Sequence, residues 1–290
     1  MASSCSNKLN TTTGLINYNG TLVPASQALL TADNRGFRYG DGLFETMLVQ
    51  NDRVRLGDYH FQRLFSGMRL LRFELPSLFT PERLEQQILE VAAANSHMGR
   101  SRARLIVFRG DGGLFDPVDS MPSYIIQASP LPAGSNGWNE TGLAINVFPD
   151  GRKSCDLFSA LKSNNYLLYV MAAFYARERH LNDCLVLNSQ GRVADSTIAN
   201  LFYIKDNQFY TPPLSEGGVA GVMRRYLLES LPGAGFAVSE RAIHPNDLKN
   251  ADEIFLTNAL KGINWVSSFQ DSSYTHRLTA MIYKQLIQKL

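Results

Sequence analysis

The sequence predicts an α+β or α/β protein of two domains. Its 290 residues, 44% of them hydrophobic, can bury two cores of ordinary size. Along the chain, apolar residues change between the alternating spacing of strands and the three- or four-residue spacing of helices. Residues 130–137 are rich in Pro, Gly, Ser and Asn, which disfavour both. We therefore expect a small N-terminal α+β domain in residues 1–129, an interdomain loop at 130–137 and a larger C-terminal domain in residues 138–290.

The N-terminal domain is expected to begin with two strand pairs. Residues 15–18 and 21–23 alternate in polarity around Asn19-Gly20, which readily takes the positive φ angles of a tight turn. A second pair is expected at residues 43–49 and 54–56.

Two helices and two further strands complete this domain. Apolar residues from Phe61 to Leu71 recur at helical steps. Thr80 followed by Pro81 is a capping residue before a proline at the first helical position, which predicts a second helix. Strands are expected at residues 104–108 and 124–128.

The C-terminal domain should also alternate between strands and helices. The expected elements are a strand at 142–148, a helix at about 165–180, strand pairs around 189–191 and 206–207, a helix at 224–231, strands at 236–241 and 254–257, and a final helix.

Composition excludes several classes of function. The net charge of +2 comes from interspersed residues, so we expect no nucleic-acid partner. No stretch approaches a membrane span of roughly 18 apolar residues, and residues 1–10 lack the pattern of an export signal, so we expect a cytoplasmic protein with no membrane partner. Cys5, Cys155 and Cys184 suit reduced thiols, and neither they nor the five histidines have metal-ligand spacing. We expect no metal site.

Common catalytic motifs are also missing. The segment Gly110-Asp111-Gly112-Gly113 follows an expected strand but lacks the dinucleotide fingerprint and the helix that should follow it, so it is interpreted as a loop. The chain contains no Walker lysine motif and no Gly-x-Ser-x-Gly elbow.

An ordered set of motifs carries the chemical information. Its members are residues 33–46 (DNRGFRYGDGLFET), 60–64 (HFQRL), 162–167 (KSNNYL), 191–202 (GRVADSTIANLF), 211–213 (TPP), 221–224 (GVMR) and 252–260 (DEIFLTNAL). From about Gly14 to the C-terminus, this order resembles the class IV aminotransferase family, also called fold type IV. The family includes branched-chain and D-amino acid aminotransferases and 4-amino-4-deoxychorismate lyase. The resemblance implies the two-domain fold of D-amino acid aminotransferase and the cofactor pyridoxal 5′-phosphate. It further implies a homodimer with the site between the two domains and a pocket loop from the neighbouring subunit.

Lys162 is the candidate catalytic residue. A pyridoxal phosphate enzyme needs an amine that forms an aldimine with the cofactor and loses its proton near neutral pH. Lys162 stands on a short junction before the helix expected at 165–180, and it matches the lysine of the family motif. Without that motif, an exposed lysine would be the simpler interpretation.

The resemblance also implies which residues bind the cofactor. Arg63 matches the phosphate arginine, and Val222 and Met223 begin a helix whose amides face phosphate oxygens. Asp195 stands where the family has a glutamate that pairs with the pyridine nitrogen, so the charge is kept on a side chain one methylene shorter. Tyr166 and Asn258 are the remaining expected cofactor-binding residues. Without the resemblance, Tyr166 would be interpreted as a core residue.

Substrate residues are less well marked. Arg38, Phe44, Arg109 and Lys261 are the candidates, the three cations as carboxylate partners. Arg102 and Arg104 share one strand face, where a solvated position would explain them.

Two reactions stay open. The first is transamination of an α-amino acid or related amino compound with a 2-oxo acid. The second is a 4-amino-4-deoxychorismate lyase reaction that eliminates pyruvate and gives 4-aminobenzoate. The segments 109–113, 221–224 and 258–260 resemble the lyase branch more closely. A third hypothesis, a homologue that binds the cofactor without turnover, rests only on Asp195.

Overall fold

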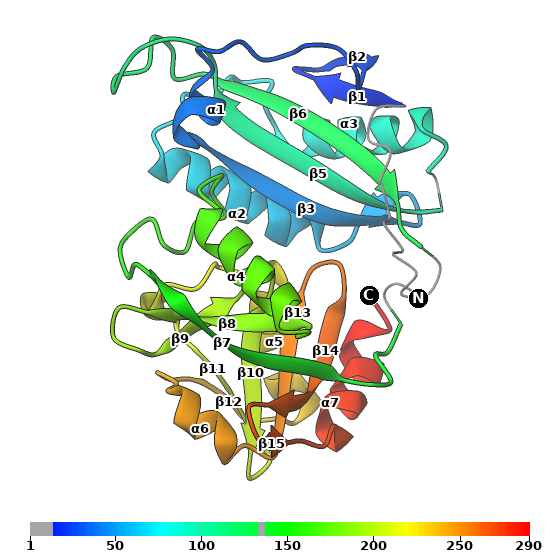
Figure 1. The fold of residues 1–290 in the computed structure, drawn as a ribbon. Coiled ribbons are helices and arrows are strands. Elements are labelled where there is room, and N and C mark those ends of the chain that lie inside the picture. Colours follow the sequence, from blue (N-terminus) through cyan, green and yellow to red (C-terminus); the bar gives the residue numbers. More distant parts are fainter. Residues whose placement is uncertain (1–13, 98, 133–136) are drawn as a thin grey trace, which may run out of the picture.

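The computed structural model describes residues 14–97, 99–132 and 137–290, which form two lobes, each built around one sheet (Figure 1). The first lobe ends with a strand that stops at Pro130, and the first strand of the second lobe begins at Leu143. The loop expected at 130–137 lies in this connection, although its residues 133–136 are outside the described ranges.

The first lobe holds a six-stranded antiparallel sheet in the order β2-β1-β6-β5-β3-β4. The hairpin expected around Asn19-Gly20 is confirmed, with φ angles of 49° and 91° at these two residues. The strands are β1 (Leu15–Tyr18), β2 (Thr21–Pro24), β3 (Gly42–Gln50), β4 (Arg53–Val54), β5 (Arg100–Arg109) and β6 (Pro122–Pro130).

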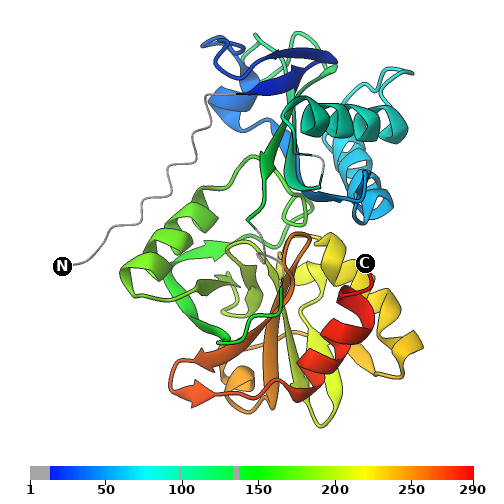
Figure 2. The same ribbon diagram turned by 90° about the vertical axis from the view of Figure 1, so that its right-hand side faces the viewer.

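Two helices, α2 (Gly57–Leu70) and α3 (Pro81–Ala94), cover one face of this sheet (Figure 2). The Thr80 side chain accepts a hydrogen bond from the amide of Arg83, so the expected cap of α3 is formed. Met47, Leu105 and Ile126 on the sheet pack with Leu64 and Ile88 on the helices to make the core.

The second lobe contains a mixed nine-stranded sheet in the order β12-β11-β10-β13-β14-β7-β8-β9, with β15 paired to β14. Leu185 on β8 and Val193 on β9 share a core with Leu201 on β10 and Leu256 on β13. Because distant strands contribute to one core, the sheet is strongly curved. Its strands are β7 (Leu143–Lys153), β8 (Asp183–Asn188), β9 (Val193–Ser196), β10 (Asn200–Lys205), β11 (Gln208–Thr211), β12 (Val238–Glu240), β13 (Glu253–Asn258), β14 (Gly262–Phe269) and β15 (Ser272–Ser273).

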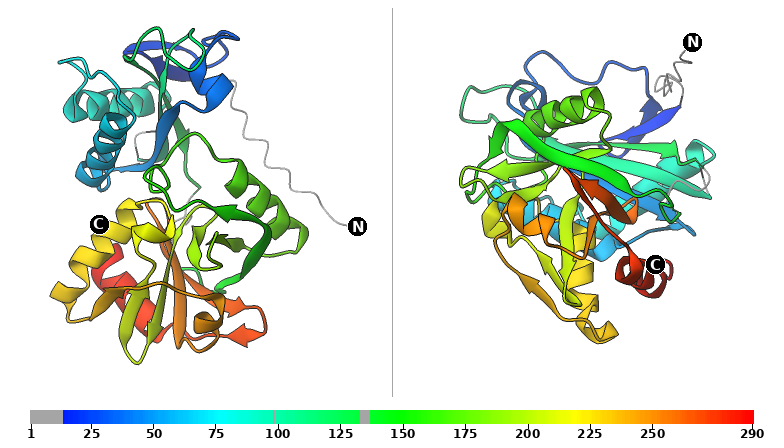
Figure 3. Two further views of the ribbon diagram at one scale, coloured as in Figure 1. Left: turned by 90° about the vertical axis from the view of Figure 1, so that its left-hand side faces the viewer. Right: turned by 60° about the horizontal axis from the view of Figure 1, so that its bottom comes forward.

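Helices cover this sheet on two sides. Helix α4 (Leu167–Glu178) packs on β7 and β8, whereas α5 (Val222–Ser230) and α7 (Arg277–Ile282) lie on the other side of the molecule (Figures 2 and 3). Helix α7 continues as a π-helical turn (Tyr283–Ile287).

Several elements were not expected from the sequence, among them α1 (Arg35–Tyr39), α6 (Pro245–Lys249), β14 and β15. The helices α1 and α6 have only five residues each, too few to show periodicity. Strand β14 was missed because its alternation is interrupted: a register shift between Val266 and Ser268 marks an irregularity in its pairing with β7.

No helix among the described residues has both the length and the hydropathy that crossing a membrane requires. Cys155 and Cys184 are free thiols, and Cys5 lies outside the described residues, as do residues 1–10.

Candidate active site

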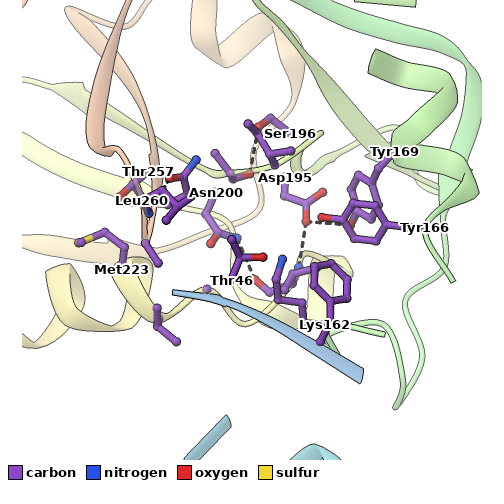
Figure 4. A pocket seen from close by; sticks show the side chains of 18 of the residues that line it. Thr46, Lys162, Tyr166, Tyr169, Asp195, Ser196, Asn200, Met223, Thr257 and Leu260 are labelled. Carbon is purple, nitrogen blue, oxygen red and sulfur yellow. Dashed lines mark hydrogen bonds between the residues drawn. The ribbon is translucent and has the colours of Figure 1, made fainter. Parts of the chain in front are cut away.

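A cavity of about 510 Å³ lies where the two lobes meet, within the size range of small-molecule sites (Figure 4). The first lobe lines it with side chains from β3, α2 and β5, and the second lobe supplies the rest. The lining residues are Phe44, Thr46, Arg63, Arg102, Arg104, Lys162, Asn164, Tyr166, Tyr169, Val170, Asp195, Ser196, Ile198, Ala199, Asn200, Val219, Gly221, Val222, Met223, Thr257, Asn258, Ala259 and Leu260.

Lys162 is placed by backbone pairing between the lobes. The Phe44 amide donates to the Lys162 carbonyl over 2.9 Å, and the Asn164 amide donates to the Gly42 carbonyl over 3.0 Å. A β-bridge between Leu43 and Ser163 lies between these bonds. The junction that carries Lys162 is therefore a short strand-like addition to β3, and its position is fixed from both lobes.

The amine of Lys162 sits in a partly buried, cation-rich environment. Nζ lies 4.3 Å from the ring centroid of Phe44 and 5.6 Å from that of Tyr166. Burial, reinforced by the guanidinium of Arg63, lowers the pKa of Lys162 to about 7, against the opposing effect of Glu45. An amine with this pKa is partly unprotonated at neutral pH, as a nucleophile or proton acceptor must be.

Asp195 is buried on strand β9 with one oxygen left unpaired. Oδ2 accepts hydrogen bonds from the Val219 amide and the Tyr169 hydroxyl, each over 2.9 Å. Oδ1 is buried and has no hydrogen-bond partner among the described residues. Burial raises the pKa of Asp195 to about 6, although Lys153 and these two hydrogen bonds act to lower it. The carboxyl group can therefore accept one further donor from within the cavity.

Arg63 reaches the cavity from α2 and is held by a buried carboxylate. Its Nε donates to Glu45 Oε1 over 2.8 Å, its Nη2 to Glu45 Oε2 over 2.5 Å, and its Nη1 to the Ala220 carbonyl over 2.9 Å. A guanidinium has five N–H groups, so two remain for a ligand.

Glu45 also accepts a hydrogen bond over 2.6 Å from Nδ1 of the fully buried His60. Burial raises the pKa of Glu45, but Arg63 and His60 together lower it to about 2. Burial lowers the pKa of His60, so we assign its neutral form with the proton on Nδ1.

The N-terminus of α5 forms another wall. Gly221 precedes the helix without a side-chain cap, so the amides of the first turn, including those of Val222 and Met223, have no intrahelical acceptor. A Cβ on Gly221 would lie 1.8 Å from Asn200 Oδ1, which explains the glycine. Unpaired amides at a helix N-terminus suit an anion.

A solvated position would have been enough to explain Arg102 and Arg104 in the sequence, but the structure gives them a place in the site. Both are partly buried and line the cavity, and the Arg104 guanidinium lies 4.2 Å from the ring centroid of Phe44. Burial and the neighbouring Arg102 lower the pKa of Arg104. Together with Arg63 and Lys162 they oppose a single lining carboxylate, Asp195, so the cavity favours anionic ligands.

Three of the expected substrate residues lie elsewhere. Arg109 is buried, pairs with Asp41 over 2.5 Å, and donates to the Leu71 carbonyl, so it stabilises the first lobe. Arg38 is exposed and pairs with Asp33 over 3.1 Å. Lys261 is exposed and its amide donates to Asn258 Oδ1 over 2.8 Å. None of the three lines the cavity as this single chain forms it, so their role as carboxylate partners stays a prediction.

The other predicted residues are brought together. Arg63, Lys162, Tyr166, Asp195, Val222, Met223 and Asn258 all line the cavity, and so does Phe44. Asn258 Oδ1 is already used by the amides of Leu260 and Lys261, so it shapes the turn at this wall. Tyr166 packs edge-on to Phe44, with ring centroids 5.2 Å apart.

Three supporting groups had no role assigned from the sequence. Glu45 is a charged residue inside the apolar run of β3, which was a usable signal. Tyr169 follows Tyr166 by three residues, so helical spacing would have placed both on one face. Lys153, which donates to Tyr169, had no sequence signal.

The wall formed by residues 259–260 is tied to the first lobe. Arg55, just after β4, donates through Nη2 to the carbonyls of Ala259 and Leu260. Arg55 itself does not line the cavity.

Comparison with known proteins identifies the family of this chain. Residues 42–269 match the family model described as amino-transferase class IV. The aminodeoxychorismate lyase of Vibrio harveyi is 30% identical over 237 residues, covering 81% of this chain and 85% of the relative. A putative branched-chain-amino-acid aminotransferase of Methanocaldococcus jannaschii is 28% identical over 279 residues, 94% of each chain.

Among solved structures, a branched-chain amino acid aminotransferase of Escherichia coli has a TM-score of 0.86 at 23% identity, covering 95% of this chain and 94% of that one. The expected α+β fold type IV architecture is confirmed. Since the family model spans most of the sequence, this protein belongs to the class IV aminotransferase family, whose members are pyridoxal-phosphate-dependent enzymes.

Proposed function

We propose that this protein is an aminotransferase that binds pyridoxal 5′-phosphate between its lobes and uses Lys162 as its catalytic amine. One observation carries the proposal: a lysine with a pKa of about 7 shares a cavity with Asp195, whose buried Oδ1 has no hydrogen-bond partner among the described residues. A buried acceptor of this kind fits a protonated ring nitrogen.

The cavity residues suit the three polar ends of the cofactor. The two remaining N–H groups of Arg63 and the first-turn amides of α5 would hold the phosphate. Asp195 Oδ1 would accept a hydrogen bond from the ring nitrogen, and Tyr166 would face the ring hydroxyl. Gly221 lets the backbone come close to the phosphate, because no Cβ fills the space.

Lys162 would then move the proton on which the reaction depends. When bound, pyridoxal phosphate would supply an aldehyde that condenses with amines and a ring that accepts electrons from the substrate's α-carbon. The Nζ of Lys162, once released by the incoming amine, would take a proton from that carbon and return one. Its lowered pKa provides the unprotonated form at neutral pH.

Arg102 and Arg104 indicate the substrate class. Both reach the cavity from β5, and Arg104 lies against Phe44 close to Lys162. A guanidinium pairs well with a carboxylate, so we propose an amino donor or 2-oxo acid with its carboxylate at Arg104.

The second candidate function is a 4-amino-4-deoxychorismate lyase. The observation that favours it is the 30% identity to the Vibrio harveyi protein of that name. The same lysine and the same cationic wall would serve, since proton movement by Lys162 is common to both reactions.

Parallel assays of the purified protein loaded with pyridoxal phosphate would separate the candidates. One would follow amino-group transfer from a panel of amino donors to 2-oxo acids. The other would follow 4-aminobenzoate from chorismate and glutamine with an aminodeoxychorismate-forming enzyme. Transfer that Lys162→Ala abolishes would support the first candidate, and 4-aminobenzoate lost in the same variant would support the second. Cofactor binding without either activity would favour a homologue without turnover.

We also propose a homodimer. Leu167, Val170, Met171 and Phe174 form an exposed apolar stripe on α4 at helical spacing, and Val170 reaches the cavity. Met171→Lys combined with Phe174→Lys should yield monomers by light scattering, whereas a monomeric wild type with full activity would contradict the proposal. A cytoplasmic location stays a prediction, to be tested by cell fractionation.

A further inference from the structure

We infer that Lys153 and Tyr169 form a relay that sets the charge and the orientation of Asp195, with Lys153 at its outer end, Tyr169 in the middle and Asp195 facing the cofactor. The inference rests on the proposed function, because it concerns the carboxylate proposed to meet the cofactor ring. Tyr169 and Asp195 line the cavity, whereas Lys153 lies behind them and would act through them as a positioning residue.

The relay is a continuous chain of hydrogen bonds. Lys153 Nζ donates to Tyr169 Oη over 2.7 Å and to the Ser159 carbonyl over 3.0 Å. Tyr169 Oη lies 2.9 Å from Asp195 Oδ2. Figure 4 shows the Tyr169 side chain meeting Asp195 on the same side of the cavity as Lys162.

Donor and acceptor chemistry gives this chain a direction. An ammonium group can only donate, so Tyr169 Oη must accept from Lys153. The single phenolic proton is then available to Asp195 alone, and Oδ2 is the acceptor. Because the Val219 amide also donates to Oδ2, the carboxyl group is held with Oδ1 as its unpaired oxygen. The orientation that leaves Oδ1 available thus depends on both Tyr169 and Val219.

Lys153 also places a positive charge near Asp195, which favours the ionised carboxylate. Burial raises the pKa of Asp195, and Lys153 is the strongest of the groups that lower it again. Tyr166 and Tyr169 face the same carboxyl group, and Lys162 is the other cation that affects it. Burial lowers the pKa of Lys153, whereas Asp195, Asp156 and Cys155 raise it. An ionised Asp195 is the form that favours a proton on the cofactor nitrogen.

The short side chain of Asp195 explains why the relay would be needed. A side chain one methylene shorter than glutamate reaches less far, so its orientation matters more for any group in the cavity. Tyr169 holds it by Oδ2, which leaves Oδ1 as the oxygen available to a ligand. The Tyr169 hydroxyl points its proton at Asp195 only if its oxygen accepts a hydrogen bond from another group. Lys153 is the only donor to this hydroxyl among the hydrogen bonds of the described residues.

The test is a ¹⁵N NMR measurement on holoenzyme loaded with pyridoxal phosphate that carries ¹⁵N in the ring. The variants are Lys153→Met, Lys153→Arg, Tyr169→Phe and the double variant Lys153→Met/Tyr169→Phe. Arg152→Met is the matched control, because Arg152 precedes Lys153 on β7 but is exposed and bonds only the carbonyls of Pro149 and Gly151. Equilibrium dialysis of each apoprotein against the cofactor gives a second readout.

We expect wild type, Lys153→Arg and Arg152→Met to show a protonated ring nitrogen. Lys153→Met and Tyr169→Phe should both move the ¹⁵N shift towards the unprotonated value, with about tenfold weaker cofactor binding, the loss typical of one hydrogen bond to a charged group. The double variant should be no worse than the more severe single one, because both break one chain.

A wild-type ¹⁵N shift and wild-type affinity in both Lys153→Met and Tyr169→Phe would overturn the relay. If Lys153→Met failed to fold, Tyr169→Phe, which keeps the ring in place, would decide alone. A wild-type protein that bound no pyridoxal phosphate would contradict the proposed function itself, and the two failures are thereby distinguished.

Discussion

The amide of Phe44 donates to the carbonyl of Lys162 over 2.9 Å, so the residue that carries the candidate catalytic amine is paired with a strand of the other lobe. Lys162 therefore lies in a segment of the second lobe that pairs with the sheet of the first lobe. Its amine also lies 4.3 Å from the ring centroid of the same Phe44. The position of this one side chain depends on how the lobes are assembled.

Replacing Lys162 tests the site directly. Lys162→Ala should leave the fold intact, because the pairing with β3 uses only backbone atoms, and should reduce turnover at least ~10²-fold through loss of proton transfer. Borohydride reduction of the wild-type holoenzyme, followed by peptide mapping, should place the pyridoxyl group on Lys162. A label on another lysine would contradict the assignment.

The lowered pKa of Lys162 predicts a pH-dependent cost to stability. Below pH 7 the amine is protonated in the folded and unfolded protein alike, and its burial is unfavourable throughout that range. Between about pH 7 and its ordinary value of 10.5, the unfolded chain binds more protons, so apoprotein stability should rise with pH.

Lys162→Met should therefore stabilise the apoprotein by on the order of 2 kcal/mol below pH 7, and the gain should fade as pH approaches 10. Urea unfolding of both proteins across this range provides the measurement. A gain independent of pH would mean that packing, not charge, explains it.

Asp195→Asn keeps the volume of the side chain and removes its charge. If Oδ1 pairs with the cofactor nitrogen, the variant should remove the substrate α-proton roughly tenfold to hundredfold more slowly in single-turnover experiments. Asp195→Glu should retain most activity if the extra methylene fits, although overpacking would reduce it. An Asn variant that reacted at the wild-type rate would assign Asp195 to support of the turn alone.

Glu45→Gln should destabilise the protein by roughly 3 kcal/mol, because it leaves Arg63 buried without its carboxylate. In wild type, this contribution is present above the ordinary pKa of 4.5 and is lost as pH falls towards about 2. Asp252→Asn is the control: its pair with Lys205 is exposed on both sides, so its loss should cost at most ~1 kcal/mol. Equal effects of the two variants in urea unfolding would rule out a special role for Glu45.

Two arginines on β5 should behave differently. Arg104→Met should raise the KM for an anionic substrate roughly tenfold or more, with little effect on the midpoint of thermal unfolding. Arg109→Met should lower that midpoint instead, because it leaves the Asp41 carboxylate without one of its two arginine partners. Steady-state kinetics and calorimetry on the same preparations would separate the two roles, and the reverse outcome would contradict the placement of both residues.

The set of motifs was enough to predict the proposed cofactor residues that line the cavity, but neither the two arginines of β5 nor the groups that support them. Arg63, Lys162 and Asp195 are far apart in sequence. All three line one cavity, as the order of the family motifs implied. Strand parity would have distinguished the arginines. Arg102 and Arg104 share one face of β5, whereas Arg109 has the parity of Leu105 and Val107, which pack in the core. The relay through Lys153 and Tyr169 joins β7 to α4, and no local pattern encodes that contact.

Arg55 supports one wall of the cavity from a position outside it. Its side chain contacts the carbonyls of Ala259 and Leu260, yet it lies outside the space that a ligand would occupy. Releasing that hold would loosen one wall without removing any group that recognises a ligand. A substitution of Arg55 would therefore be overlooked by any comparison restricted to the residues that line the cavity.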